Sequence, residues 1–91
     1  MEILETLRAL NACFGPSGQE GAVAEAIRNI AAPYVDECTV DTLGNLLCHK
    51  KGKGPKVLFA AHMDSIGLII THIDEHGFLR FGPVGGLSAH E

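Results

Sequence analysis

Cysteine is sparse in this sequence, and the three that occur, Cys13, Cys38 and Cys48, form no C-x-x-C pair. A secreted domain of this size that depended on disulfides would contain more cysteines, in an even number. We therefore predict that these side chains are small buried hydrophobic residues in a reducing compartment. The start of the chain also lacks the basic and apolar segments of a secretory signal. These absences predict a cytoplasmic protein.

Long apolar runs and an excess of positive charge are absent as well. The longest strictly apolar run covers residues 57–61, far short of the ~20 residues that cross a bilayer. The net charge is −4, and glycine and proline interrupt the one basic cluster, Lys50, Lys51, Lys53 and Lys56. We interpret this cluster as a solvated turn rather than a phosphate or polyanion site, because a nucleic-acid partner would require cations gathered on one face. We expect neither a membrane nor a nucleic acid among the partners.

Hydrophobic periodicity predicts two helices at the start of a single domain. The first ends at Gly15-Pro16, because proline is unfavourable in a helix interior, and its apolar face consists of Ile3, Leu7, Leu10 and Phe14. Residues 17–20 (Ser-Gly-Gln-Glu) match a capping box, in which Ser17 caps the second helix and the Glu20 side chain reaches back. That helix ends at Pro33, and its apolar face consists of Val23, Ile27 and Ile30.

The remaining sequence predicts about five strands, over residues 34–41, 46–50, 56–61, 66–73 and 78–81. Turns are predicted at residues 41–45 and 74–77, and residues 82–86 are expected to interrupt the order again. The fold class is therefore α/β, with two N-terminal helices packed on a mostly β region. The strand at 56–61 has the composition of one buried on both faces, and so does the segment at 66–70. Two helices cover only one face of a sheet, so we expect this chain to be a piece of a larger protein.

A histidine and an acid follow directly after this apolar strand. Side chains two apart on a strand point to the same side, so His62 and Asp64 are expected to project together at its carboxyl end. An imidazole is a good ligand for zinc or cobalt, and a carboxylate commonly orients it or joins the metal. A lone His-x-Asp is more often an ordinary polar pair at a strand end. Its place against an apolar strand favours the metal site, because a buried charge without a partner is costly.

Further motifs surround this pair at consistent spacing. They are residues 60–70 (AAHMDSIGLII), 71–81 (THIDEHGFLRF) and 84–86 (VGG), preceded in order by 15–20 (GPSGQE) and 41–46 (DTLGNL). Together they cover nearly all of the chain, and they resemble the M42 family of metalloaminopeptidases, which includes glutamyl and deblocking aminopeptidases. Several motifs in order are far more specific than His-x-Asp alone.

The resemblance implies a hydrolase that uses two adjacent divalent ions, zinc or cobalt, to remove N-terminal residues from peptides. His62 matches the family's first metal-ligand histidine. Asp64, the predicted catalytic-site residue, matches the acid behind that histidine. The bridging aspartate, the general-base glutamate and the other ligands lie later in family members, so residues 1–91 are expected to hold at most a partial site. The family's oligomerisation domain is inserted after the Val-Gly-Gly segment. We therefore expect the N-terminal portion of a catalytic domain, truncated before that insertion, and a homo-oligomer at full length.

Ser65 departs from the family pattern, because many members have glutamate there. We interpret it as subfamily variation, and a decayed site is the alternative. The other histidines, His49, His72, His76 and His90, do not complete a metal site, so the 91-residue chain alone is expected to be inactive. Two other classes stay open. One is a stable non-catalytic domain that self-associates or binds a full-length relative through exposed edges. The other is a small binding module unrelated to peptidases.

Overall fold

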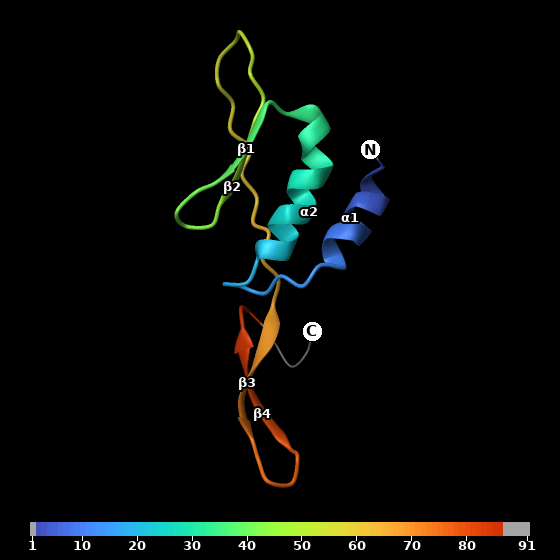
Figure 1. The fold of residues 1–91 in the computed structure, drawn as a ribbon, viewed down its shortest axis with the longest axis vertical. Helices are drawn as coiled ribbons and strands as arrows, with labels where there is room; N and C mark the ends of the chain where they lie inside the picture. Colours follow the sequence, from blue (N-terminus) through green and yellow to red (C-terminus); the bar gives the residue numbers. More distant parts are fainter. Residues whose placement is uncertain (1, 87–91) are drawn as a thin grey trace.

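The computed structural model describes residues 2–86, so His90 lies outside the described part. Two helices come first, α1 (Ile3–Asn11) and α2 (Gly21–Ala31), followed by a short 3-10 helix, η1 (Ala32–Tyr34). The described strands are β1 (Glu37–Val40), β2 (Leu46–His49), β3 (Gly67–Ile73) and β4 (Leu79–Val84). They form two separate antiparallel hairpins. The β1–β2 hairpin lies beside α2, and the β3–β4 hairpin extends away from the helices at the opposite end of the molecule (Figure 1). The α/β class is as predicted, with both helices before the strands.

The two helices lie side by side, and α2 also contacts β2 (Figure 1). α1 begins after Glu2, whose carboxylate accepts hydrogen bonds from the Leu4 and Glu5 N–H groups at 3.2 and 2.9 Å. An acid at this position satisfies free amides and complements the helix dipole. The helix ends at Asn11, so Phe14 lies beyond it and is 68% exposed. The prediction that Phe14 belongs to the helical face is wrong, because the chain leaves the helix a turn earlier.

α2 supplies the small core of the described residues. Val23 is 6% exposed and is the one buried hydrophobic side chain among residues 2–86. Pro33 falls within η1, where the α-helical pattern has already ended, so its predicted role as a stop agrees with the structure.

Ser17 does not cap α2, contrary to the prediction. The N-cap residue is Glu20, and no side chain caps the first turn. The Glu20 carboxylate reaches back, as expected, but it accepts from the N–H of Gly18 rather than that of Ser17. Gly18 has a φ of +89°, a conformation that favours glycine. In this loop the Ser17 hydroxyl donates to Asp64 instead of capping the helix.

Both predicted turns are present, and each is held by an aspartate. Asp41 Oδ1 accepts from the N–H groups of Leu43 and Asn45, at 3.0 and 2.8 Å, in the loop between β1 and β2. Asp74 Oδ1 accepts from the N–H groups of His76 and Phe78, both at 2.9 Å, in the loop between β3 and β4. Such bonds replace backbone turn interactions and fix the register of each hairpin.

β4 was predicted to end at residue 81, but it continues through Gly82 and Pro83 to Val84. Pro83 faces Leu68 across the hairpin. Proline donates no hydrogen bond, but a two-stranded sheet consists of edge strands, where a missing donor is tolerated. The prediction that residues 82–86 interrupt the order therefore holds only for the last two.

The strand predicted at residues 56–61 does not form. This segment has no strand assignment, and Leu58 and Phe59 are 85% and 93% exposed. The predicted burial on both faces is therefore wrong for this segment, because no strand among residues 2–86 pairs with it. It is wrong for residues 66–70 as well, where Leu68, Ile69 and Ile70 are each more than half exposed, because β3 pairs with β4 alone. The apolar composition is present, but the neighbours that would bury it are not supplied by the described residues.

The cysteines also differ from the prediction, since none of the three is buried. Cys38 and Cys48 are register partners across the β1–β2 hairpin, with their Sγ atoms 3.4 Å apart. The β1–β2 hairpin is exposed on much of its surface, so its paired thiols are only partly covered.

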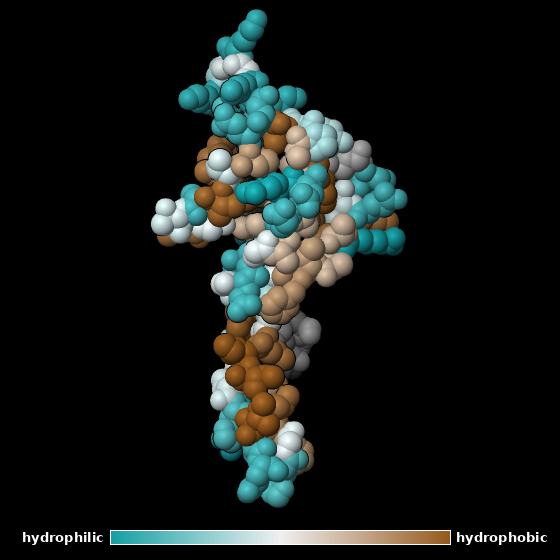
Figure 2. All heavy atoms as spheres, viewed as in Figure 1, coloured by the Kyte–Doolittle hydropathy of each residue, from teal (hydrophilic) through white to brown (hydrophobic). Residues whose placement is uncertain are grey.

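The molecule is extended rather than compact, with principal extents of 62 × 30 × 23 Å. Its radius of gyration is 17.2 Å, whereas a compact chain of this length would have about 12 Å. Its accessible surface is 7840 Å², against about 5,100 Å² for a compact monomer of this mass. Apolar side chains cover the β3–β4 hairpin, between hydrophilic ends (Figure 2). Among residues 2–86, neither helix has the length and apolar character needed to cross a bilayer.

Candidate functional site

The predicted pair is brought together by a direct contact. His62 Nδ1 lies 3.0 Å from Asp64 Oδ1 and 3.2 Å from the backbone oxygen of Asp64. The two side chains meet even though residues 56–61 form no strand, so the contact does not depend on the regular strand alternation that was expected to give it. The His62 side chain is 85% exposed and that of Asp64 is 40% exposed.

A third residue completes this arrangement. The Ser17 hydroxyl donates a hydrogen bond to Asp64 Oδ2 at 2.6 Å, across 47 positions of sequence. The two oxygens of one carboxylate therefore serve different partners, Oδ1 the imidazole and Oδ2 the hydroxyl. The Ser17 hydroxyl, and after it the His62 ring, hold the pKa of Asp64 below its ordinary value of 3.8. The carboxylate is thus ionised at neutral pH and acts only as an acceptor.

Backbone contacts hold the segments of Ser17 and Asp64 side by side. The N–H of Ser65 donates to the carbonyl of Gly15 at 2.8 Å. Pro16 and Ser65 form an isolated parallel bridge. Gly15 is buried, and a Cβ built there would lie 2.2 Å from Val23 Cγ2. Only glycine allows the loop to pass this close to α2, so the Gly-Pro-Ser sequence sets the approach of Ser17 to Asp64.

The chemistry of the pair fits one ligand of a metal ion. An ionised carboxylate can only accept, so Nδ1 of a neutral His62 ring must carry the proton, and the lone pair is then on Nε2. An imidazole backed in this way by a carboxylate is a common arrangement for zinc ligands. Among residues 2–86, however, no three or more His, Cys, Asp or Glu side chains gather in a group that could hold an ion. The described residues therefore supply part of a site.

A concave region of about 730 Å³ adjoins the pair. His62, Met63 and Asp64 form part of its wall, and most of the remainder is apolar, including Leu43 and Phe59. This size is within the range of ligand pockets. Phe59 and Ala61, which line this concave region, belong to the apolar segment at 56–61 that has no strand partner among residues 2–86. The apolar wall of the region is therefore also a surface that a neighbouring strand could cover.

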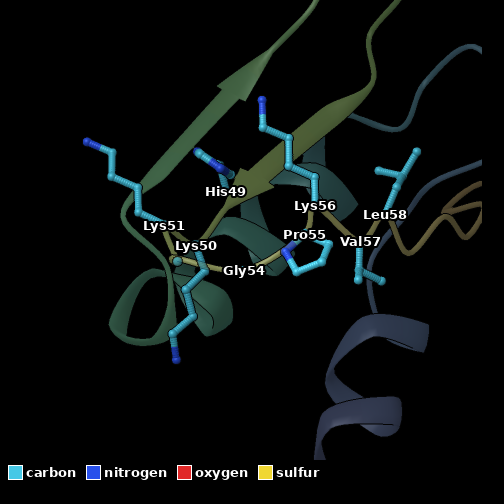
Figure 3. Close-up of a pocket in the computed structure, with 9 residues that line it drawn as sticks. His49, Lys50, Lys51, Gly54, Pro55, Lys56, Val57 and Leu58 are labelled. Atoms are coloured by element: carbon cyan, nitrogen blue, oxygen red, sulfur yellow. The ribbon is translucent and has the colours of Figure 1, made fainter.

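A second concavity, of about 480 Å³, is unrelated to the pair. It lies in the loop after β2 and contains none of Ser17, His62 and Asp64. Figure 3 shows that the side chains of Lys50, Lys51 and Lys56 point in different directions from this loop. Cations that diverge in this way do not form a convergent anion site, in agreement with the interpretation of this cluster as a solvated turn.

The segment that contains the pair matches a family model. The model describes the M42 glutamyl aminopeptidases, and it matches residues 44–90. This chain belongs to the M42 family. Its resemblance to that family, seen first in the motifs around His62, is therefore confirmed.

Relatives and solved structures of the M42 family agree over nearly the whole chain. A putative aminopeptidase of Acetivibrio thermocellus is 48% identical over 90 residues, covering 99% of this chain and 27% of the relative. The structure of an aminopeptidase from the archaeon Desulfurococcus kamchatkensis matches with a TM-score of 0.87 and 38% identity, covering 94% of this chain and 24% of that one. PhTET1-12s, a dodecamer, matches with a TM-score of 0.81 and 39% identity, covering 97% of this chain and 27% of that one. The chain thus spans about a quarter of the length of the M42 proteins that it matches.

Sequence reasoning predicted that His62 and Asp64 project together, and the structure shows this contact, but it missed their connection to Ser17. The periodicity of residues 17–20 favoured a helix cap, and nothing in a single sequence links positions 47 residues apart. The one available signal was that the Gly-Pro-Ser-Gly motif belongs to the same set of M42 motifs as His-x-Asp. Of the other histidines that the structure describes, His49, His72 and His76 are exposed, and none joins a group of three or more potential metal ligands.

Proposed function

We propose that this chain forms the N-terminal portion, residues 1–91, of the catalytic domain of a metal-dependent aminopeptidase that removes N-terminal residues from peptides. In this proposal His62 is a ligand of one of two divalent ions, zinc or cobalt, and Asp64 orients its ring. The observation that supports it is the 3.0 Å contact between His62 Nδ1 and Asp64 Oδ1, in a segment that matches the M42 family. When bound, such ions supply Lewis acidity toward a peptide carbonyl.

The chain's own residues prepare one corner of this site. Asp64 holds the ring so that Nε2 is free to bind, and the exposed position of His62 leaves that nitrogen accessible. A two-metal hydrolase also needs further ligands and a base within hydrogen-bond reach of its substrate. Because residues 2–86 contain no ligand cluster, we propose that the 91-residue chain alone does not turn over peptides.

Assembly and location belong to the same proposal. A solved structure with 39% identity to this chain is a dodecamer, which supports a homo-oligomer for the full-length protein. The family resemblance implies that its oligomerisation domain would follow the Val-Gly-Gly segment. The low cysteine content, without a C-x-x-C pair, supports a cytoplasmic location.

Metal binding can be tested directly on the 91-residue chain. Adding Co²⁺ should broaden the NMR signals around the His62 ring first, since a paramagnetic ion acts on nearby nuclei. His62→Ala should abolish this local effect, whereas His76→Ala, at an exposed loop histidine, should leave it intact. Broadening that centres elsewhere, or that survives in His62→Ala, would contradict the proposed ligand. Peptide turnover by the chain alone, with Co²⁺ or Zn²⁺, would contradict its proposed incompleteness.

A second function is favoured by the exposed apolar surface. Leu58 and Phe59 are exposed, and Figure 2 shows apolar side chains on the surface of the β3–β4 hairpin. Both are available to another protein surface. A stable non-catalytic domain that self-associates, or that binds a full-length relative, would use this surface. Pull-down of a full-length M42 protein by the chain would support this function, and a monomeric chain with no such binding would exclude it.

A further inference from the structure

The Asp64 carboxylate is held from two sides, and only one of the two contacts belongs to the His-x-Asp pair. We propose that Ser17 is a positioning residue, whose hydroxyl fixes the plane of the Asp64 carboxylate and so keeps the Nδ1–H tautomer of His62. This inference rests on the proposed function of His62 as a ligand, because it concerns how that ligand is prepared.

The geometry of the carboxylate requires a second contact. Rotation about the bond from Cβ to Cγ of an aspartate is broad, so one hydrogen bond leaves the carboxylate plane poorly defined. In this structure Oδ1 lies 3.0 Å from His62 Nδ1, and Oδ2 accepts from the Ser17 hydroxyl at 2.6 Å. Partners on both oxygens restrict that rotation. The shorter bond is the one to Ser17, as expected for a hydroxyl donating to a charged acceptor.

The Ser17 hydroxyl has no other role in the described structure. Capping of α2 does not involve it, because Glu20 is the N-cap residue and no side chain caps the first turn. The loop is positioned by other groups, namely the Ser65 N–H on the Gly15 carbonyl and the bridge between Pro16 and Ser65. Ser17 is itself exposed. Removing its hydroxyl should therefore leave the loop in place and change only the carboxylate.

The tautomer of His62 determines whether the ring can act as a ligand at Nε2. A neutral imidazole has one proton, shared between two tautomers, and the hydrogen bond at one nitrogen selects which of them is populated. With Asp64 held as an acceptor at Nδ1, the proton lies there and Nε2 presents its lone pair. If the carboxylate rotates away, only the backbone oxygen of Asp64, 3.2 Å from Nδ1, still favours a proton there. The Nδ1–H tautomer then loses its charged acceptor, and the fraction of rings ready to bind an ion falls.

The experiment measures this tautomer without any metal. The ring ¹⁵N shifts of His62 are recorded near pH 8.5, about two units above the ordinary histidine pKa. Wild type, Ser17→Ala, Ser17→Thr and Ser65→Ala are compared. We expect mainly Nδ1–H in wild type and Ser17→Thr, which keeps the hydroxyl, and a mixture of tautomers in Ser17→Ala. Ser65→Ala is the matched control, because Ser65 is next to Asp64 and contributes only its backbone N–H.

A metal titration of the same variants separates the two proposals. Loss of a group that orients a metal ligand costs about 10–100-fold in metal affinity. Ser17 contacts the orienting group, Asp64, rather than the ligand His62 itself, so its effect should be smaller. We therefore expect Co²⁺ binding to weaken about 3–10-fold in Ser17→Ala. A tautomer shift in Ser17→Ala without any Co²⁺ binding in wild type would support the positioning role and overturn the ligand role of His62. A wild-type tautomer in Ser17→Ala, or an equal shift in Ser65→Ala, would overturn the positioning role.

Two further variants of Ser17 serve as a control in case Ser17→Ala does not fold. Ser17→Val and Ser17→Thr have the same branched shape and differ in the hydroxyl alone. If Ser17→Ala loses its folded spectrum, the comparison of these two decides the question. A mixed tautomer in Ser17→Val with Nδ1–H in Ser17→Thr supports the proposal, and identical ring shifts in the two contradict it.

Discussion

At the scale of single residues, the structure brings together side chains that are far apart in the sequence. Asp64 accepts from Ser17 and from His62 with different oxygens, so its ionised form is stabilised from both sides. Because folding stabilises the ionised form of Asp64, the stability of the folded chain should depend on pH in the acid range.

Acidification should weaken the Ser17–Asp64–His62 contacts. Because the pKa of Asp64 is lower when folded than its ordinary value of 3.8, the carboxylate contributes stability above that value, and the contribution is lost as the pH falls through the folded-state pKa. NMR titration of the Asp64 carboxyl carbon should give a midpoint below 3.8, and Ser17→Ala should raise it toward 3.8. The pKa of Asp41, which is lowered by Asn45, is the internal control and should not move. Equal Asp64 midpoints in the two proteins would contradict the contact.

The close approach of Gly15 to α2 gives a second test. Gly15→Ala would place a methyl group 2.2 Å from Val23 Cγ2, and such overpacking costs about 1–3 kcal/mol. Thermal unfolding followed by circular dichroism should show the loss, together with a weaker protection of the Ser65 amide from exchange. Gly21→Ala is the control, because nothing lies within 4 Å of its added Cβ and alanine suits a helix. An unchanged melting curve for Gly15→Ala would show that the loop can move away at little cost.

At the scale of the elements, the parts that the sequence predicted are those governed by local rules. The helix over residues 21–31 has the expected period, and the Asp41 and Asp74 turns have side chains that bond their own neighbours. The contact between His62 and Asp64 could be predicted because the two residues lie only two positions apart.

The parts that failed depend on distant residues. The segment at 56–61 has the composition of an interior strand, yet strand formation needs a partner that the described residues do not provide. Ser17 resembled a helix cap, and only the folded loop shows that it reaches Asp64. The Cys38 and Cys48 side chains were expected to be buried, but a two-stranded hairpin has too few neighbours to cover them.

The two cysteines of the β1–β2 hairpin provide a test of the register in which β1 pairs with β2. Cys38 and Cys48 face each other with 3.4 Å between their Sγ atoms, so oxidised glutathione should convert them to one intramolecular disulfide, with two thiols oxidised and one glutathione disulfide reduced. The partial cover of the hairpin, and then the hydrogen bond with Cys38, raise the pKa of the Cys48 thiol, so the reaction should be faster at higher pH. Mass spectrometry should show the cross-link in Cys13→Ala as well as in wild type. A preference for a disulfide with Cys13 would show that the register is wrong.

At the scale of the whole molecule, the exposed apolar surface predicts association. The β3–β4 hairpin presents Leu68, Ile69 and Ile70, each more than half exposed. We expect the 91-residue chain to form oligomers at micromolar concentration in sedimentation experiments, because large apolar patches on a monomer are unfavourable in water.

Substitution on β3 can locate that association. Ile69→Lys should weaken it several-fold, since a charge would have to be buried in the contact. Thr71→Lys, two residues further along the same strand, removes no apolar side chain and is the matched control. Equal effects of the two substitutions would mean that added charge alone, rather than the Ile69 surface, controls association.

The long exposed loop between β2 and the His62 segment has a consequence for limited proteolysis. A cut among residues 51–55 would place Ser17 on one polypeptide and Asp64 on another, because the loop lies between them in the chain. The Gly15–Ser65 and Ser17–Asp64 contacts would then join two molecules instead of one. Orientation of the His62 ring would become a bimolecular property, present when the two pieces are concentrated and lost when they are diluted.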